Sequence, residues 1–413
     1  MKISPVILLV LLAMLTVGPV YSQEPVSANI KTGSDILLLK PDSLKGQKDL
    51  ADIARRIFKK KTTKDPGSKK LHISAIPAAG YSLQTGWAGV FSTNLAFYTK
   101  SKPTADEKLS TVLASITYSQ YNQIIFPLQA NIWTKNNKYN IITDWRYLKY
   151  PSTTYGLGPD TKTTDGYTVD YSYIKLHQTI LRNIYKDLYA GLGYYFDHFW
   201  NVKEIDPVAG VTTSFRKYGF SNNVTASGLA VKMLYDSRLN PINSTNGWYA
   251  NIIFRQNFTF SGSDNNWQSM LVELRKYFHF PSSSKNVLAI WNYDWITPGG
   301  KPPYLLLPST GWDDFYNTGR GYIQGRYRDN NMIYLESEYR FGISANGLFG
   351  AVIFVNGESF SQTLRKEFSV IAPGYGVGVR LKLNKYSDTN ICVDYGFGND
   401  YSRGIAVNLG EVF

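Results

Sequence analysis

The chain alternates between apolar and polar residues over long stretches, and residues 247–260 show this most clearly. A period of two places successive side chains on opposite faces of an extended strand, so one face is apolar and the other polar. The segment exceeds the about five or six residues of a typical globular strand and suits a tilted strand that crosses a membrane. The apolar face carries Trp248, Ala250, Ile252, Phe254, Phe258 and Phe260, and the polar face carries Tyr249, Asn251, Arg255, Asn257 and Thr259.

The same alternation recurs from residue 71 onward and predicts about sixteen strands, an even number as expected of a bacterial membrane barrel. The predicted strands are 71–81, 85–99, 109–120, 123–134, 138–149, 166–183, 188–200, 224–236, 247–260, 267–280, 286–297, 331–342, 347–356, 374–384, 389–397 and 403–413.

The connections between the predicted strands alternate in length. Those after even-numbered strands are short and rich in turn residues, whereas the long ones follow odd-numbered strands. Short periplasmic turns and long outer loops produce this asymmetry in a transmembrane barrel. The short connections are 135–138, 281–286, 343–347 and 384–390, and the long ones are roughly 150–165, 201–223, 298–330 and 357–373.

The fold class that follows is all-β: a transmembrane antiparallel β-barrel of about 16 strands over residues 71–413, preceded by a short N-terminal periplasmic segment. A large soluble β-sandwich or propeller is the alternative. It gives no reason for the asymmetry of the connections, and the sequence has no blade repeat.

Composition supports a membrane location. The chain has 31 Tyr, 21 Phe and 9 Trp, and amphipathic aromatic side chains gather where apolar and aqueous regions meet. Its mean hydropathy of −0.24 is compatible with a barrel because only alternate strand residues face lipid. The net charge of +13 favours an anionic surface. Without a recognisable nucleic-acid-binding module, we expect outer-membrane lipid and lipopolysaccharide as partners and no nucleic acid.

Residues 1–22 have the features of a secretory signal peptide. Lys2 precedes an apolar run at 6–17 that is too short to span a bilayer, and Val20 and Ser22 are suitably placed for signal-peptidase cleavage. Export combined with the barrel pattern predicts the bacterial outer membrane as the location of the protein.

Residues 23–70 differ from the rest and are expected to form a periplasmic leader. Within it, residues 49–61 place apolar side chains at helical spacing among many lysines and arginines, which predicts a short basic amphipathic helix. A disordered, solvated leader accounts equally well for the same residues.

The last predicted strand ends on Phe413, on the same apolar face as Ile405, Val407 and Leu409. A terminal aromatic residue on an alternating last strand is the usual sorting signal of outer-membrane barrels, and we assign that role to Phe413. Glu411 interrupts the face at a depth where lipid headgroups would accept a charge.

No catalytic constellation is recognisable. The histidines lack metal-ligand spacing, there is a single cysteine, and no nucleophile elbow, phosphate loop or dinucleotide fingerprint occurs. We therefore expect no enzyme activity, no metal site and no cofactor. The residues concerned are His72, His177, His198, His279 and Cys392.

Charged residues fall instead on the predicted inner faces of the strands, where a polar, hydrated lumen with compensating pairs accounts for most of them. They are Glu336, Glu338 and Arg340 on one strand, Arg380 and Asp394 as a pair on neighbouring strands, and Lys232, Asp236, Arg255, Glu273, Arg275 and Asp294 elsewhere.

Several stretches in the same order resemble the BamA/TamA superfamily of outer-membrane barrels, also described as the bacterial surface antigen domain. Any one of them alone would be weak, but the combination is specific. They are IPAAGYSLQTGWAGV (76–90), LYDSRLNPINSTNGWY (234–249), GRGYIQGRYRDNNMIYLESEYRF (319–341), GAVIFVNGESF (350–360), and APGYGVGVRLKL (372–383) with ICVDYGFG (391–398).

The resemblance implies a barrel whose sixth outer loop, 298–330 here, folds back into the lumen. Arg320, Gly321 and Tyr322 match the loop-anchor motif at its tip, and the arginine would reach an acidic inner wall. Glu338 is the expected partner, with Glu336, Arg340 and Asn356 on the same inner wall. Arg326 and Arg328 are expected to face headgroups or the lumen.

This sequence departs from the family pattern at two positions of the motif. Gly319 stands where the family usually has an aliphatic residue, and Asn356 stands where it usually has aspartate. Asn356 can accept a hydrogen bond but supplies no charge.

Assembly factors of the superfamily carry periplasmic POTRA modules, and residues 23–70 are too short for one. The resemblance implies an insertase or translocase barrel that works in or alongside outer-membrane protein assembly. Its partners would be other assembly subunits or unfolded barrel clients. A passive small-solute pore or a structural surface barrel is the alternative.

Overall fold

The computed structural model describes residues 46–57, 71–82, 85–100, 104, 107–206, 210, 212–363, 368 and 370–413. The expected signal peptide and most of the leader lie outside these residues. One helix, α2 (Leu50–Ile57), lies within the segment expected to be helical. None of the described helices is long and apolar enough to cross a membrane.

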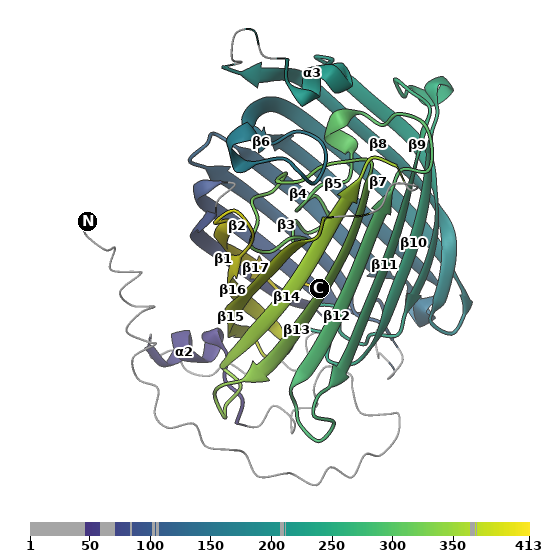
Figure 1. The fold of residues 1–413 in the computed structure, drawn as a ribbon. Coiled ribbons are helices and arrows are strands. Elements are labelled where there is room, and N and C mark those ends of the chain that lie inside the picture. The colour runs from purple at the N-terminus through teal and green to yellow at the C-terminus, as the bar shows by residue number, and fades with distance from the viewer. Residues whose placement is uncertain are drawn as a thin grey trace.

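In the described part of the chain, seventeen strands form one sheet. Sixteen of them build the wall, and the remaining one, β6, is a short strand in an outer loop, so the predicted sixteen-stranded fold is confirmed (Figure 1). The wall strands are β1 (Leu71–Ser82), β2 (Gly86–Phe97), β3 (Ser110–Ser119), β4 (Ile124–Trp133), β5 (Tyr139–Lys149), β7 (Tyr167–Tyr185), β8 (Leu188–Ile205), β9 (Val224–Asp236), β10 (Gly247–Asn257), β11 (Trp267–His279), β12 (Val287–Ile296), β13 (Asn331–Gly342), β14 (Phe349–Ser361), β15 (Ala372–Asn384), β16 (Thr389–Phe397) and β17 (Arg403–Leu409).

The remaining elements are short and lie in the connections. They are β6 (Ser152–Thr154), α3 (Ser214–Gly219) and the 3-10 turns η3 (Lys135–Asn137), η4 (Thr163–Asp165), η5 (Thr259–Ser261) and η6 (Tyr304–Leu306).

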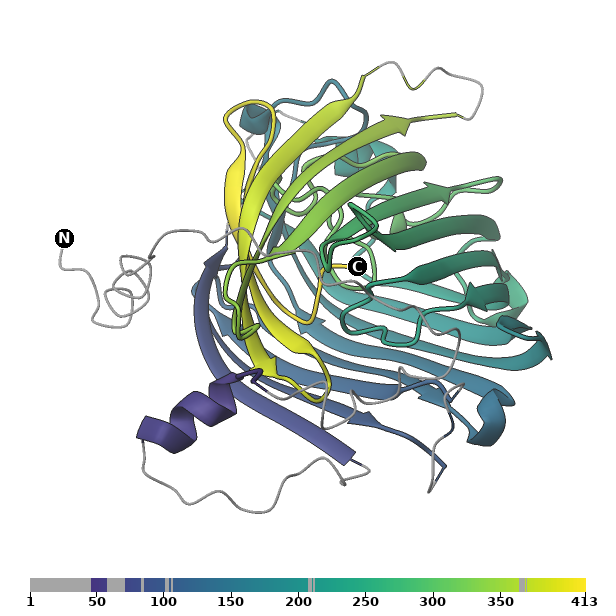
Figure 2. The ribbon, with the colours of Figure 1, turned by 90° about the horizontal axis from the view of Figure 1, so that it is seen from below.

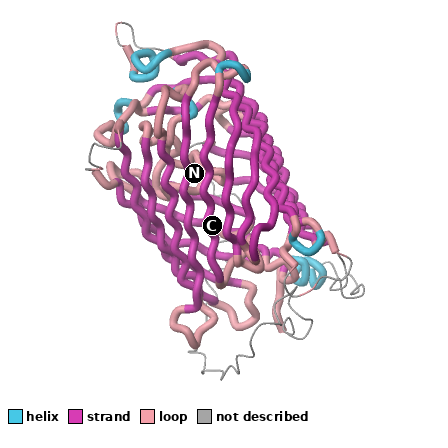
Figure 3. Tube along the Cα trace, turned by 90° about the vertical axis from the view of Figure 1, so that its right-hand side faces the viewer, coloured by secondary structure: helices cyan, strands magenta, loops and turns pink. Residues whose placement is uncertain are grey.

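Each wall strand pairs antiparallel with the next, and β5 pairs directly with β7. The strands run side by side at a tilt and surround a lumen (Figures 2 and 3). Among the described residues no backbone ladder joins β1 to β17, although these two strands lie close to each other. We call this unpaired boundary the seam.

Alternation decides which side chains face outward. On β14, Ile353 and Val355 are more than half exposed, whereas Phe354 and Asn356 between and after them are buried. The same parity buries Lys232, Asp236, Arg255, Glu273 and Arg275 on the inner side, as expected.

The expectation for Asp294 is wrong. On β12 the buried positions are Trp291 and Tyr293, so Asp294 falls on the opposite face. It accepts a hydrogen bond from Asn292 Nδ2 at 3.0 Å, two residues earlier on that same face.

A turn between β9 and β10 reaches across the inner end of the barrel. Residues 237–246, here the crossing turn, place Ile242 in a buried cluster with Ala96 and Leu109 from the β2–β3 side. The carbonyl of Ile242 accepts from the amide of Glu411 at 2.9 Å. The crossing turn therefore connects opposite parts of the wall.

Helix α2 docks on the inner-end turns of the C-terminal strands. Asp52 accepts from Lys385 Nζ at 2.8 Å, and the amide of Lys48 donates to the carbonyl of Asn346 at 3.0 Å. The carboxylates of Asp49 and Asp52 each accept a hydrogen bond from the backbone amide of the other residue. These bonds satisfy amide donors that have no partner within the first turn of the helix. The helix thus sits beside β15, near the lower ends of the C-terminal strands in Figure 1.

An aromatic cluster, here the aromatic cap, packs at the outer end of the barrel. Side chains from α3, η6 and the long strands pack together, and Phe215, Tyr304 and Leu307 are almost fully buried there. Ring pairs such as Phe215 with Tyr304, at 5.0 Å between centroids, add directional contacts to the burial of apolar area.

Placing a charge on the lipid-facing side should test this orientation. Val377 on β15 is 56% exposed among outward-facing apolar residues. Val377→Arg should destabilise the barrel by about 2–4 kcal/mol, because a cation near the bilayer midplane loses its hydration. Urea unfolding in liposomes measures the loss. Tyr401→Arg, at a fully exposed position in an outer loop, is the control and should be neutral.

Candidate functional site

The connection between β12 and β13, residues 297–330, folds into the lumen; we call it the lumen loop. Its tip lies against β15 and β16, and its other contacts reach β4, β5 and β7 across the barrel. The sequence predicted this segment to within one residue, at 298–330, and its inward fold is the one that the family resemblance implied. The contacts of its tip define the candidate site.

Arg320 at the tip is buried among three carboxylates. Its Nη1 lies 2.8 Å from Asp394 Oδ2, and its Nη2 lies 2.6 Å from Glu338 and also contacts Glu336. Its guanidinium covers the ring of Phe354 at 3.7 Å. Sequence reasoning named Glu338 as the partner, and the structure brings in carboxylates from two strands.

The three carboxylates around Arg320 stabilise its positive charge. Burial opposes the charged form, but Glu336, Glu338 and Asp394 raise the pKa of Arg320 well above its usual value. A buried ion is tolerated only where opposite charges and hydrogen bonds compensate its lost hydration. The tip of the lumen loop is therefore held by a fixed cation.

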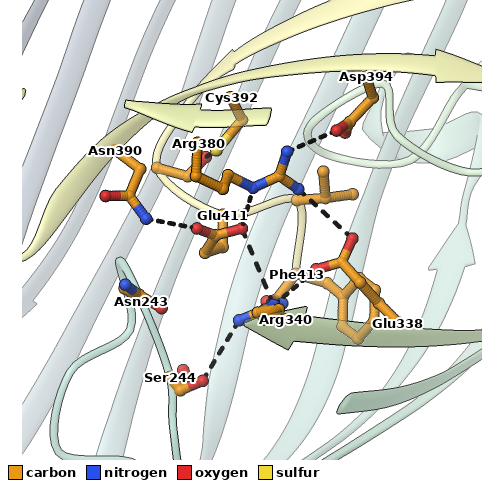
Figure 4. Close-up of polar contacts among 12 residues, drawn as sticks. Asn243, Ser244, Glu338, Arg340, Arg380, Asn390, Cys392, Asp394, Glu411 and Phe413 are labelled. Atoms are coloured by element: carbon orange, nitrogen blue, oxygen red, sulfur yellow. Dashed lines mark hydrogen bonds and ion pairs between the residues drawn. The ribbon is translucent and has the colours of Figure 1, made fainter. Parts of the chain in front are cut away.

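Two further arginines extend this arrangement into one cluster (Figure 4). Arg340 binds Glu338 at 2.6 Å, and Arg380 binds Glu411 at 2.7 Å and also contacts Asp394. We call the whole set the ion cluster. It consists of Arg320, Arg340, Arg380, Glu336, Glu338, Asp394 and Glu411.

Asn356 and Tyr322 hold the backbone of the tip. Asn356 Nδ2 donates to the carbonyl of Arg320 at 3.0 Å. An ionised aspartate has no hydrogen to donate and could not make this bond. Tyr322 Oη donates to the carbonyl of Pro373 at 2.6 Å and accepts from the amide of Asn399 at 2.9 Å. The departure at Asn356 thus supplies a donor to the loop backbone.

Glycines make the close approach of tip and wall possible. Gly321 has a φ of +112°, and a Cβ there would lie 2.5 Å from the carbonyl oxygen of Phe397. A Cβ on Gly396 would lie 2.7 Å from the amide nitrogen of Gly321, and one on Gly374 would lie 2.7 Å from the carbonyl oxygen of Arg320. The alternate glycines of this wall form a flat floor under the tip.

The family pattern has an aliphatic residue at the position of Gly319. Two neighbours, Thr310 and Glu358, explain the glycine, and the sequence analysis singled out neither of them. Glu358 on β14 is 1% exposed and accepts from Thr310 Oγ1 at 2.8 Å. A Cβ on Gly319, whose φ is +72°, would lie 2.5 Å from Thr310 Cγ2 and 3.2 Å from Glu358. The space that an aliphatic residue would need is filled by this pair.

A second anchor of opposite charge holds the lumen loop on the far wall, and sequence reasoning missed it. Asp314 binds Lys175 of β7 at 3.2 Å, and its carbonyl accepts from Gln129 of β4 at 2.8 Å and from Arg146 of β5. Arg146 also covers the ring of Tyr316 at 4.9 Å. The acidic pair Asp313–Asp314 was the only sequence signal for it.

Arg326 and Arg328, which we expected to face headgroups or the lumen, are packed inside the protein. Arg326 is 1% exposed and Arg328 is 2% exposed. Arg326 donates to the carbonyl of Thr161 at 2.7 Å and pairs with Asp400 at 3.0 Å. Arg328 donates to the carbonyl of Tyr304 at 3.0 Å. Arg326 therefore ties the lumen loop to the β6–β7 and β16–β17 connections, whereas Arg328 joins two parts of the lumen loop itself.

The expected lipid-facing position of Phe413 is also wrong. Gly410, with a φ of +94°, ends β17, and residues 410–413, here the tail, turn into the lumen. Phe413 is 3% exposed and stacks on Trp291 with ring centroids 5.1 Å apart. Glu411 joins the ion cluster and does not face headgroups. A sorting role for Phe413 stays a prediction.

A cavity of about 650 Å³ remains beside the tip of the lumen loop. It lies against the inner faces of β2, β3 and β4, which are small and uncharged, as at Ala88, Ser92 and Ser115. Its lining also includes Ala79 of β1 and Ala406 of β17. This cavity therefore extends to both strands of the seam.

Comparisons with known proteins report on the overall fold of the chain. No family model and no curated protein sequence matches the chain. Solved structures do match. BamA from Haemophilus ducreyi lacking POTRA domains 1–3 has a TM-score of 0.51 at 13% identity, covering 82% of this chain and 70% of that one.

CdiB from Acinetobacter baumannii has a TM-score of 0.51 at 10% identity. That match covers 83% of this chain and 60% of CdiB, so the chain spans less than two thirds of the length of that relative. At 13% and 10% sequence identity, these two matches show a shared fold. The chain has the fold of the BamA-type outer-membrane β-barrels, as the sequence resemblance implied.

Proposed function

We propose that this chain is an outer-membrane barrel that works in or alongside the assembly of outer-membrane proteins, without enzymatic chemistry. The seam carries the proposal. β1 has 12 residues and β17 has 7, and no backbone ladder joins them within the described residues. Unpaired strand edges can template an incoming extended segment by main-chain hydrogen bonds.

The lumen loop supports this role by bracing the wall beside the seam. It spans the lumen from Asp314 on one side to Arg320 on the other. Arg320 and the tail share the ion cluster with strands β13, β15 and β16, which lie just before β17. The wall can therefore keep its shape on one side of the seam while the seam itself is unpaired.

The alternative of a passive small-solute pore is less well supported. The aromatic cap occupies the outer end, and the crossing turn and the tail occupy the inner end. A steady solute path would have to displace these packed segments. The comparisons with BamA and CdiB support the outer-membrane barrel fold on which the proposal rests.

Locking the seam tests the proposed function. One cysteine at Ala75 or Ala79 and another at Ile405 or Val407, in a Cys392→Ser background, would join β1 to β17 as a disulfide. Because an incoming strand needs the free edges, insertion of an unfolded model barrel into liposomes should stop on oxidation and recover on reduction.

The matched control joins two strands that are already paired. Tyr339→Cys with Ile353→Cys links Cα partners on β13 and β14. This disulfide should leave insertion unchanged. If the seam disulfide forms fully and insertion continues at the same rate, the proposed function is wrong.

Removing the cation of the tip should release the lumen loop. Arg320→Ala leaves three buried carboxylates without their shared partner, so we expect a loss of about 3–5 kcal/mol in urea unfolding. Protease cleavage within 297–330 should also become faster. Arg326→Ala and Arg328→Ala should cost less, because they remove mainly hydrogen bonds to carbonyl groups.

An exposed arginine provides the control for Arg320. Arg182 on β7 is exposed, so Arg182→Ala should change stability by no more than about 1 kcal/mol. Equal protease sensitivity for Arg320→Ala and Arg328→Ala would contradict the special role of the tip.

The glycine floor allows a test that leaves every charge in place. Gly396→Ala puts a methyl group 2.7 Å from the amide nitrogen of Gly321, so the tip must move away from the wall. We expect a destabilisation of about 1–3 kcal/mol together with faster cleavage of the lumen loop. Gly342→Ala meets open space and should behave as the unmodified chain. Identical behaviour of the two variants would argue against close docking.

A further inference from the structure

We propose that the free edge of β17, and not that of β1, is the edge on which this barrel accepts an extended segment of a partner polypeptide. The partner segment is one whose side chains alternate between apolar and polar. The inference rests on the proposed function, because it specifies which side of the seam does the docking. It follows from the direction of the backbone groups on the two strands.

The hydrogen-bond pattern of β2 fixes the direction of the groups on β1. The carbonyl of Trp87 accepts from the amide of Gln120 at 2.7 Å, so the backbone of Trp87 points toward β3. Directions alternate along a strand, and therefore Phe91 also points toward β3. Phe91 is the Cα partner of Pro77, so the backbone of Pro77 points away from β2 and into the seam.

Pro77 interrupts the free edge of β1. The register of β1 on β2 continues without a shift from Leu71 to Ser82, so all its odd-numbered residues share this direction. Proline has no amide hydrogen and lacks the donor that an added strand requires. The free edge of β1 is thus divided at its middle, with donors at Ala75 and Ala79 on either side.

The free edge of β17 is continuous. Gly410 donates to the carbonyl of Asn390, and Gly398 donates to that of Ser402, both at 2.8 Å, so even-numbered residues point toward β16. The backbone groups of the odd-numbered residues therefore point into the seam. These residues are Arg403, Ile405, Val407 and Leu409, and each has an amide donor.

The two faces of β17 indicate what the segment would look like. Ile405 and Val407 face outward, 38% and 49% exposed, so a neighbouring strand would present apolar side chains on that side. Gly404, Ala406 and Asn408 face the cavity of about 650 Å³. Small side chains here leave room for the inward, polar side chains of an added strand.

Crosslinking in the full-length protein, in phosphatidylethanolamine and phosphatidylglycerol liposomes, tests this assignment. Three single-cysteine variants are made in the Cys392→Ser background: Val407→Cys on β17, Ala75→Cys on β1 and Ile353→Cys as the control. Ile353 is equally exposed, but β14 is paired on both sides. The probe is a synthetic peptide of alternating valine and threonine with one central cysteine.

The expected result is a disulfide adduct with Val407→Cys about fivefold above that with Ala75→Cys, the effect of one net hydrogen bond. The adduct with Ile353→Cys should be the weakest. An adduct with Ala75→Cys equal to or above that with Val407→Cys overturns the assignment of the edge but leaves the proposed function standing. Adducts at neither edge above the Ile353→Cys level overturn both.

A second variant tests the role of the proline itself. Pro77→Val restores the missing donor, so it should raise the adduct at Ala75→Cys toward the level at Val407→Cys. An unchanged adduct at Ala75→Cys would show that Pro77 does not decide between the two edges.

Discussion

The ion cluster is the interaction on which the interior of this barrel depends. Arg320 comes from a loop, Glu336, Glu338 and Asp394 from the wall, and Glu411 from the tail. A buried charge without a partner costs far more than a hydrogen bond gains, so each member requires the others. One set of charges therefore fixes the lumen loop, the C-terminal wall and the tail relative to one another.

The seam is linked to this cluster through the tail. β17 ends at Leu409, and the next residues turn inward to Arg380 and Arg340 and do not lengthen the strand. The same turn brings Phe413 onto Trp291, and the tail lines the cavity together with Ala79 of β1. β17 is thus short because the residues after Leu409 turn inward and fill part of the lumen.

Much of the architecture was predictable because its causes are local. Period-two alternation predicted the wall strands to within a few residues, and the connection lengths located the long segment that forms the lumen loop. The predictions for Asp294, Glu411 and Phe413 were wrong for another reason. Alternation was extrapolated to strand ends, where Gly410 breaks the strand or the true parity differs by one residue.

The sequence by itself determined the barrel, its approximate strand boundaries and the presence of an arginine-bearing loop, since these follow from periodicity and turn chemistry. Only the tertiary structure decided which carboxylates meet Arg320, that Asp314 anchors the far side, and that Arg326 and Arg328 are buried. Those contacts join residues distant in the chain. Their partners are chosen by the curvature of the wall and the depth of the loop, and neither is recorded in any local pattern.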